Sequence, residues 1–358
     1  METAELRYME LKNQICRQIY KGIFRNGEKI PSERQLSEDY KVSRITVRKA
    51  LELLEAEGLI LREVGNGTIV TLNNYGNETL PDVIALAAPS RNPFFARFIA
   101  EFQQCVWEHD ALLLYVEAPE NTSLEDCLYR LYTKNIRSAV VWPDDRGVDQ
   151  EKLLRLRSIG MNLVFFDTDA AGPYADSVFV DNEDAVETLL KKEERGYGQY
   201  LYVGWDNLAI ANIRKREEAF LRLCPQGQVI HVPWKRNRQM DDASREEIRR
   251  LAKDLTDALI LCGTGELAGQ TAEVIWGREQ KKTGGEQKIR LASIDEFEGA
   301  QRCPAAVYSQ DLETAACEIY RCLERQSTEK SGWKAGVVPV KGRYHRNGER
   351  KGQGKEQS

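Results

Sequence analysis

The sequence lacks the features of a membrane protein or an exported protein. None of its apolar runs reaches 18 residues, which excludes a membrane-spanning helix of ordinary length. The first residues, METAELRYMELKNQ, are charged and polar where a secretory signal carries an apolar stretch. The expected location is therefore cytoplasmic. With 358 residues, 42% of them apolar and 30% charged, the chain is long enough for two or three globular domains.

Histidine is scarce, and the cysteines are not spaced for metal binding. The three histidines, His109, His231 and His345, lie far apart in the sequence. None of the eight cysteines forms a Cys-x-x-Cys pair or joins a histidine at zinc-ligand spacing, so we expect no metal site. Most cysteines stand inside apolar segments, which predicts buried, reduced thiols.

The motifs of common enzyme classes are also missing. The sequence has no glycine-rich phosphate loop, no Gly-x-Ser-x-Gly elbow and no His-Glu-x-x-His pair. The glycines of residues 263–265 are too few for a dinucleotide site. We therefore expect no catalytic residues and no cofactor. The rival interpretations, an enzyme and an exported transport binding protein, have no motif in their favour.

Charge is distributed unevenly along the chain. The net charge of −5 is the balance of +1 over residues 1–74 and −6 over the remainder. DNA binding requires a local basic face rather than a basic chain. The positions of the N-terminal charges, rather than their sum, therefore indicate whether this region can bind DNA.

The first 71 residues are predicted to begin with two helices. An apolar stripe at helical spacing indicates a first helix that runs to about Phe24. Its members are Leu11, Ile15 and Ile19. After a turn at 26–27, Ser32 and Gln35 form a capping box, which predicts a second helix ending near Tyr40.

A third helix and a hairpin complete this N-terminal region. Ser43 is a helix cap, and Gly58 stops the helix that it begins. The apolar face of this helix consists of Val47, Ala50, Leu51 and Leu54. Residues 59–62 and 68–70 read as strands joined by the Gly65-Asn66-Gly67 tip, and the polar residues 72–81 read as a linker.

The third helix carries a basic face opposite its apolar one. Arg44 and Arg48 are four residues apart, with Thr46 beside them. Guanidinium groups there can pair with guanine or bridge phosphates, as in a helix-turn-helix recognition helix. Arg34 lies in the first turn of the second helix, which favours a phosphate contact. The tip formed by Gly65 and Asn66 can approach the minor groove.

These segments resemble the winged helix of the GntR family of bacterial transcription regulators. The resemblance covers residues 6–70 and rests on PSERQL (31–36), VSRITVRKAL (42–51), EAEGLI (55–60) and GNGT (65–68). It implies operator contacts by the residues at the family's contact positions: Arg34, Ser43, Arg44, Thr46, Arg48 and Gly65. Ile45 stands where a polar residue is common, so one family contact is expected to be absent.

From residue 82 onward, short apolar runs alternate with amphipathic helices. Strand-like runs occur at 83–88, 111–116, 139–142, 163–166, 200–203, 258–262 and 289–294. Helical stretches occur between them at 94–108, 124–134, 183–195, 213–223 and 244–255. This alternation predicts an α/β fold with parallel sheets, in two lobes over residues 82–340. Residues 341–358, with an excess of basic side chains and no apolar run, are expected to be a disordered tail.

This second region resembles the LacI/GalR and periplasmic-binding-protein-like effector fold. The resemblance rests on the segments DVIALAAPSRNPFFARF (82–98), SAVVWP (138–143), VFVDNEDA (178–185), IRKREEAF (213–220), IDE (294–296) and VYSQD (307–311). A GntR-type winged helix joined to such a fold is the plan of the arabinose-repressor group. That group's Asn-Asp pair after one strand is here Gly263-Thr264, so the ligand need not be arabinose.

The resemblance places a sugar site at the strand ends. Hydrogen-bonding side chains are expected from Arg91, Asn92, Arg214, Asp295 and Gln310. Aromatic faces are expected from Phe94, Trp142 and Trp234, although core packing is an alternative role for each of the three.

The sequence thus predicts a homodimeric repressor of a carbohydrate-utilisation operon. It is expected to bind a pseudo-palindromic operator in double-stranded DNA and to be released by a small sugar-like effector, a monosaccharide or a derivative. The effector would bind between two lobes joined by three crossing segments, near 178–181, 308–311 and 337–340. A ligand-dependent activator, or a regulator responding to a non-sugar such as a nucleoside, is the alternative.

Overall fold

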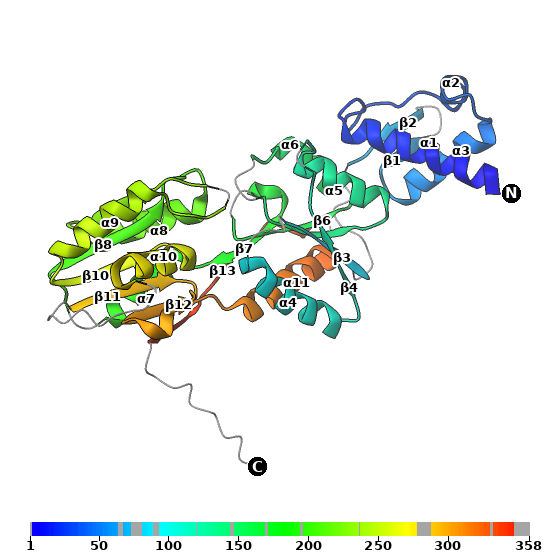
Figure 1. Ribbon diagram of the computed structural model, residues 1–358. Helices are drawn as coiled ribbons and strands as arrows, with labels where there is room; N and C mark the ends of the chain where they lie inside the picture. The colour runs from blue at the N-terminus through cyan, green and yellow to red at the C-terminus, as the bar shows by residue number, and fades with distance from the viewer. Residues whose placement is uncertain are drawn as a thin grey trace, which may run out of the picture. The chain divides into compact units, whose positions relative to one another are not determined.

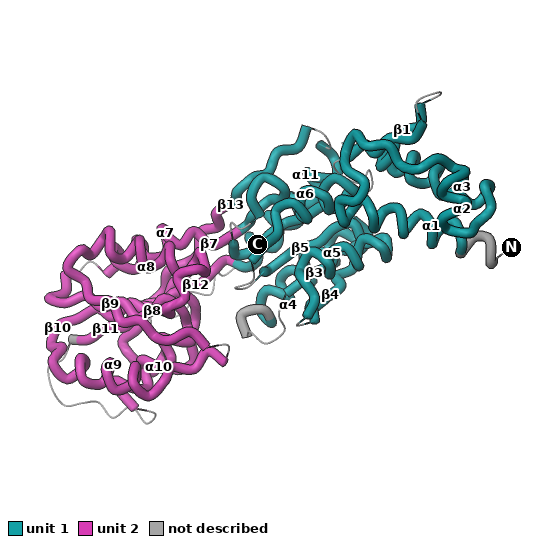
Figure 2. The backbone as a smooth tube through the Cα atoms, turned by 90° about the horizontal axis from the view of Figure 1, so that it is seen from above, with its two compact units in different colours: residues 1–178, 312–338 teal, residues 179–311, 339–358 magenta. Residues whose placement is uncertain are grey.

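The chain folds into two compact units. The computed structural model describes residues 2–63, 67–72, 81–88, 93–119, 121–143, 147–168, 171–193, 196–235, 237–277, 288–329 and 332–346. Unit 1 comprises residues 1–178 and 312–338, and unit 2 comprises 179–311 and 339–358 (Figure 2). The chain passes between them three times, which confirms the three predicted crossings. Within the described ranges, every helix is too short or too polar to span a bilayer.

Unit 1 begins with the predicted winged helix. Its elements are α1 (Glu2–Tyr20), α2 (Glu33–Asp39), α3 (Arg44–Ala56), β1 (Ile60–Glu63) and β2 (Gly67–Val70). Strands β1 and β2 pair antiparallel, and the predicted apolar stripes of α1 and α3 are buried. Helix α1 stops at Tyr20 rather than at Phe24. The cause is Gly22, whose φ of +71° ends the helix and whose N–H donates to the Ile19 carbonyl at 2.9 Å.

Serine side chains begin α2 and α3. The Ser32 hydroxyl accepts from the Gln35 N–H at 3.3 Å, and the Ser43 hydroxyl accepts from the Thr46 N–H at 3.1 Å. Only half of the expected capping box forms, because the Gln35 side chain donates forward to Asp39. Ser43 therefore fixes where α3 begins.

The α/β part of unit 1 contains a six-stranded sheet in the order β13-β7-β6-β5-β3-β4. Its elements are β3 (Val83–Ala87), α4 (Pro93–Glu108), β4 (Leu112–Val116), α5 (Leu124–Thr133), β5 (Ser138–Val141), α6 (Gln150–Ser158), β6 (Asn162–Phe166), the 3₁₀ turn η1 (Gly172–Tyr174), β7 (Asp176–Val180), α11 (Leu312–Glu329) and β13 (Val337–Val340). Strands β3 to β7 pair in parallel, as predicted. Helix α4 packs with α11, and α5 packs with α6, so each face of the sheet has its own helix pair (Figure 1).

Unit 2 repeats this plan with the order β14-β12-β11-β10-β8-β9. Its elements are α7 (Asn182–Lys192), β8 (Gln199–Trp205), α8 (Ala211–Leu223), β9 (Gln228–Val232), α9 (Asp242–Asp254), β10 (Asp257–Cys262), α10 (Gly265–Trp276), β11 (Lys288–Ile294), η2 (Ala300–Arg302), β12 (Ala305–Ser309) and β14 (Arg343–Arg346). Helices α7 and α8 pack together, as do α9 and α10. The buried side chains form two apolar clusters, one on each face of the sheet.

The C-terminal region departs from the expected tail. Residues 343–346 form β14, which pairs antiparallel with β12 at the sheet edge. Ion pairs hold this polar strand in place: Arg346 Nε lies 2.9 Å from Oε1 of Glu193, a carboxylate that also pairs with Arg290. An apolar-run criterion misses such a strand, because an edge strand needs a partner on one side only. Residues 347–358, the hairpin tip at 64–66 and most of the expected linker, 73–80, lie outside the described residues.

All eight cysteines are free, and six of them are buried. This confirms the expectation of buried thiols. Burial raises the pKa of the Cys262 thiol to about 12, which keeps it protonated and unreactive.

Candidate operator-binding and effector-binding sites

The exposed face of α3 carries two cations and one apolar side chain. Arg44 is exposed, and the Arg48 side chain retains 61% of its accessible surface. Between them, Ile45 is 81% exposed, an unusual degree for a large aliphatic side chain. Thr46 is half-buried, and its hydroxyl lies 2.8 Å from that of Ser43. The exposed side of α3 thus offers two guanidinium groups one turn apart and, beside them, a methyl-bearing contact.

One carboxylate links α3 to the wing. Glu33 accepts from Arg48 Nη2 at 3.3 Å, and its other oxygen pairs with Arg62 of β1. Arg62 therefore lies on the same side of the domain as Arg48, although sequence analysis did not single it out. A single arginine in a strand of four residues forms no motif, so no local pattern indicated Arg62. Arg34 is exposed and pairs with Glu38, one turn further along α2.

The carboxyl ends of the unit 2 strands bring two of the predicted effector residues together. Asp295 follows β11 and Gln310 follows β12, and Gln310 Nε2 donates to Asp295 Oδ1 at 2.6 Å. Asp295 has a φ of +76°, in the left-handed region that few residues other than glycine adopt, aspartate being among those that tolerate it best. Among the described residues, the buried Gln310 Oε1 has no hydrogen-bond partner. A buried acceptor in this state is suited to a ligand donor.

Aromatic side chains lie at the same edge. Trp234, which follows β9, meets Trp205 at the end of β8 edge-on, with ring centroids 5.7 Å apart. The backbone N–H of Trp234 donates to Asp206 Oδ1 at 2.7 Å, and the Arg238 guanidinium stacks 3.8 Å from the Trp234 ring centroid. Trp205, Asp206 and Arg238 were not predicted, although the first two lie within three residues of the predicted strand 200–203.

Two arginines of α8 behave differently. Arg214, the predicted anchor, leaves 43% of its side chain exposed and donates to the Leu208 carbonyl at 3.0 Å. Arg216 is 5% exposed and donates to Asn182 Oδ1 at 2.6 Å and to the Gly263 carbonyl at 2.7 Å. Gly263 itself is required, since a Cβ there would lie 2.5 Å from the Tyr202 hydroxyl. The buried cation at this edge is therefore Arg216, which sequence analysis passed over.

Unit 1 offers fewer described residues at its carboxyl edge. Trp142 follows β5 and is half-buried. Its backbone N–H donates to the Ala87 carbonyl at 2.9 Å. Arg91 and Asn92 lie outside the described residues, and so does the side chain of Phe94, although Phe94 belongs to α4. Asp167 follows β6 with a φ of +59° and was not predicted.

The N-terminal region matches a known family. The model of bacterial regulatory proteins of the gntR family matches residues 7–70. The probable fructoselysine utilization operon transcriptional repressor of Escherichia coli K12 is 37% identical over 76 residues, which are 21% of this chain and 31% of that protein. Residues 7–70 form a GntR-family helix-turn-helix domain. The chain spans under a third of the length of this curated relative, so the GntR-type domain is the shared part.

The rest of the chain has the fold of LacI-type regulators. A LacI transcriptional regulator from Lactobacillus brevis superposes with a TM-score of 0.60 at 10% identity, over 74% of this chain and 99% of that one. A LacI family regulator from Enterococcus faecalis, solved with bound ribose, gives 0.55 at 17% identity over 74% and 97%. The molecule thus joins a GntR-type domain to a LacI-type fold, the predicted plan.

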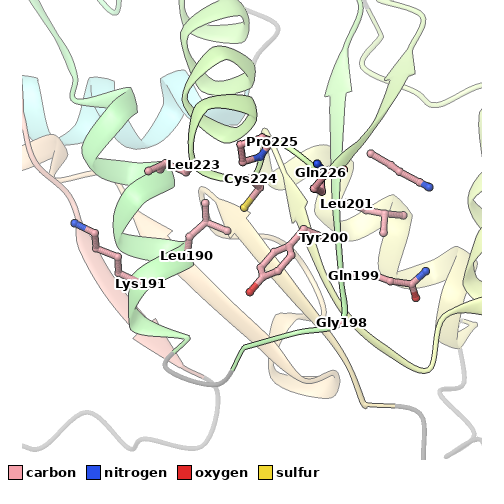
Figure 3. A pocket seen from close by; sticks show the side chains of 12 residues that line it. Leu190, Lys191, Gly198, Gln199, Tyr200, Leu201, Leu223, Cys224, Pro225 and Gln226 are labelled. Atoms are coloured by element: carbon pink, nitrogen blue, oxygen red, sulfur yellow. The ribbon is translucent and has the colours of Figure 1, made fainter.

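A surface cavity lies elsewhere in unit 2. It has a volume of about 440 Å³ and opens between the ends of α7 and α8 and the beginnings of β8 and β9 (Figure 3). Leu190, Tyr200 and Cys224 contribute to its lining. Because Asp295 and Gln310 follow the opposite ends of their strands, this cavity is separate from the predicted effector residues.

Proposed function

We propose that the protein is a sequence-specific transcriptional regulator that represses a carbohydrate-utilisation operon and is released from its operator by a small sugar-like effector. The observation that carries this proposal is the exposed Arg44–Ile45–Arg48 face of α3 in a GntR-type domain. Arginine recognises guanine through two hydrogen bonds, and an aliphatic side chain contacts the thymine methyl group. This face therefore suits base reading as well as phosphate binding, with Arg34 and the wing glycine Gly65 as phosphate or groove contacts.

The effector is proposed to bind at the carboxyl edge of the unit 2 sheet. Asp295 and Gln310 supply a hydrogen-bonding pair, Arg214 a further donor, and Trp234 a flat apolar face for the C–H side of a sugar ring. The remaining predicted residues, Arg91, Asn92, Phe94 and Trp142, belong to unit 1 and are proposed contacts of the same ligand.

A homodimer is proposed to bind a two-fold symmetric operator. Among the described side chains, the edge strand β4 and the neighbouring helix α4 leave three large apolar ones uncovered, namely Trp107, Leu112 and Leu114. Leu112 and Leu114 alternate along the strand and so point to one side. An apolar patch at a sheet edge is suited to a second copy of the same surface.

The test is a selection followed by a ligand screen. Operator sequences are selected from random duplex DNA with the purified chain, and their affinity is measured by fluorescence anisotropy at stated salt. A thermal-shift screen of sugars, sugar phosphates and nucleosides then identifies the effector, because a ligand that binds only the native state raises its melting temperature. Failure to select any sequence, with the chain folded, would refute the DNA-binding function.

A further inference from the structure

The end of α1 contacts the α/β part of unit 1 through side chains that the DNA-facing surface does not use. Tyr20 is 3% exposed, and its ring stacks on Tyr129 of α5 with centroids 4.2 Å apart and 9° between the planes. The Tyr20 hydroxyl donates to Asp126 Oδ1 at 3.0 Å. Arg155 of α6 donates to the Tyr20 carbonyl at 3.3 Å, which satisfies an acceptor at the negative end of α1.

A second set of contacts reaches the end of the recognition helix. Glu57, the C-cap residue of α3, accepts from Lys12 Nζ at 2.5 Å and from the Tyr132 hydroxyl at 3.4 Å. Arg137 lies 3.8 Å from the Glu57 carboxylate, and its guanidinium stacks 3.9 Å from the Tyr132 ring centroid. Cys16 is fully buried, with Sγ 3.8 Å from the Tyr132 hydroxyl.

These contacts enclose a shared core. The buried apolar side chains of α1 and α3 belong to the same continuous cluster as those of α5 and α6. The stripe Lys12, Cys16 and Tyr20 recurs every four residues, so it forms one side of α1 beside the stripe that packs on α3. On an independent, tethered domain this stripe would face water. Burial raises the pKa of the Cys16 thiol to about 11, so this thiol reacts slowly while the contact holds.

We propose that the winged helix works as a docked part of unit 1 rather than as a tethered module, and that this dock sets the spacing between operator half-sites. The dock is the contact of Tyr20 and Cys16 with Tyr129 and Tyr132. A domain held in one orientation presents α3 at one angle, so a dimer accepts one half-site spacing, whereas a tethered domain accepts several. The spacing role rests on the proposed function, but the dock itself does not.

The dock is tested without DNA by alkylation of the full chain. Each cysteine is followed by mass spectrometry after a pulse of iodoacetamide. In the wild type we expect Cys16 to be labelled at least tenfold more slowly than the half-buried Cys224. Tyr129→Ala should raise the Cys16 rate at least tenfold and leave Cys105, buried in α4 of the same unit, protected. Tyr129→Phe, which keeps the ring stack, and Arg130→Ala, on the exposed side of α5, should match the wild type.

Equal labelling of Cys16 and Cys224 in the wild type would overturn the dock. So would an unchanged Cys16 rate in Tyr129→Ala. If that variant exposes Cys105 as well, the fold of unit 1 has been lost, and Arg155→Ala decides instead. This milder change should raise the Cys16 rate about threefold, and no increase would overturn the proposal.

The spacing role is tested on selected operators whose half-sites are moved apart by two base pairs. Wild type should lose at least tenfold in affinity for these operators. Tyr129→Ala should lose less than threefold and bind an isolated half-site as the wild type does. A Tyr129→Ala variant that discriminates like the wild type would overturn the spacing role. If no operator can be selected at all, the proposed function fails, and the alkylation result still judges the dock.

Discussion

The two α/β units have the same strand order and differ in what their edges offer. Strands β4-β3-β5-β6-β7 of unit 1 correspond in order to β9-β8-β10-β11-β12 of unit 2. In unit 1 the outer strand and its helix expose Trp107, Leu112 and Leu114. In unit 2 the carboxyl edge carries Asp295 and Gln310 in contact with each other. The strand order follows from the repeated βα pattern, whereas the side chains at these two places differ in kind: they are apolar in unit 1 and hydrogen-bonding in unit 2.

The likeness extends to one backbone detail. In each six-stranded sheet the fourth strand in chain order, β6 or β11, is followed by an aspartate in the left-handed region, Asp167 or Asp295. Each aspartate directly follows its strand, so the two units share the same backbone turn at this point.

The largest expected effect is on dimer formation, and it should differ between the outer helices α4 and α8. Trp107 of α4 and Leu221 of α8 are both exposed, on helices that follow β3 and β8, the first strands of the two six-stranded sheets. Trp107→Asp should convert the dimer to a monomer in sedimentation velocity, because a buried, unpaired charge would oppose association. Operator affinity should then fall at least 100-fold, since two half-sites no longer bind together. Leu221→Asp is the control and should remain dimeric; two dimeric variants would contradict the assignment of the dimer surface to α4 and β4.

The second-largest expected effect is the loss of operator affinity when an arginine of α3 is removed. Arg44→Ala and Arg48→Ala should each cost about 1–3 kcal/mol if the guanidinium pairs with guanine, and less if it holds only phosphate. Arg130→Ala removes an equal charge from α5 in the same unit and should leave anisotropy titrations unchanged. Wild-type affinity in both α3 variants would exclude α3 as the recognition helix.

Much of the fold was predictable from the chain because it depends on local patterns. The α3 stripe and the Ser43 cap follow from helical periodicity and from the demand of a helix start for acceptors. Arg216 was predictable too, because it lies three residues after Ile213 and four before Phe220, on the buried side of α8. Arg214 as an effector contact stays a prediction.

Other features depend on partners far apart in sequence. The dock joins Tyr20 to Tyr129, 109 positions further along, and nothing near either residue indicates the other. Strand β14 forms because Glu193 and β12 supply its ion pair and its ladder, although its own side chains are polar.

The third expected effect is smaller and concerns the effector response of variants at Asp295 and Asp167. Asp295→Asn should raise the half-maximal effector concentration for operator release about tenfold, because a charge-assisted hydrogen bond becomes a neutral one. Asp167→Asn tests whether unit 1 contributes equally, and we expect a shift in the same direction. Asp242→Asn, an exposed position in α9, is the charge-matched control. An unchanged response in both test variants would remove this edge from the effector site.

The smallest expected effect concerns Ile45. Ile45→Ser replaces an exposed aliphatic group with a hydroxyl, and we expect a two- to fivefold loss of discrimination at one thymine position, with overall affinity nearly unchanged. Competition with single-base operator variants measures it. A uniform loss across all positions would indicate a structural role for Ile45 instead.

The three crossings also have a consequence for synthesis of the chain. Unit 1 receives α11 and β13 only from residues 312–340, and the unit 2 sheet receives β14 only from residues 343–346. On the ribosome, neither sheet can be completed until those residues have emerged, although all the elements of the winged helix precede residue 71. Tyr20 and Cys16 can therefore make their contacts with α5 only after α5 has been synthesised. Both sheets can be completed only after their last strands have been synthesised. A nascent chain stopped before residue 312 would hold two unfinished sheets, which makes it a natural client for chaperones.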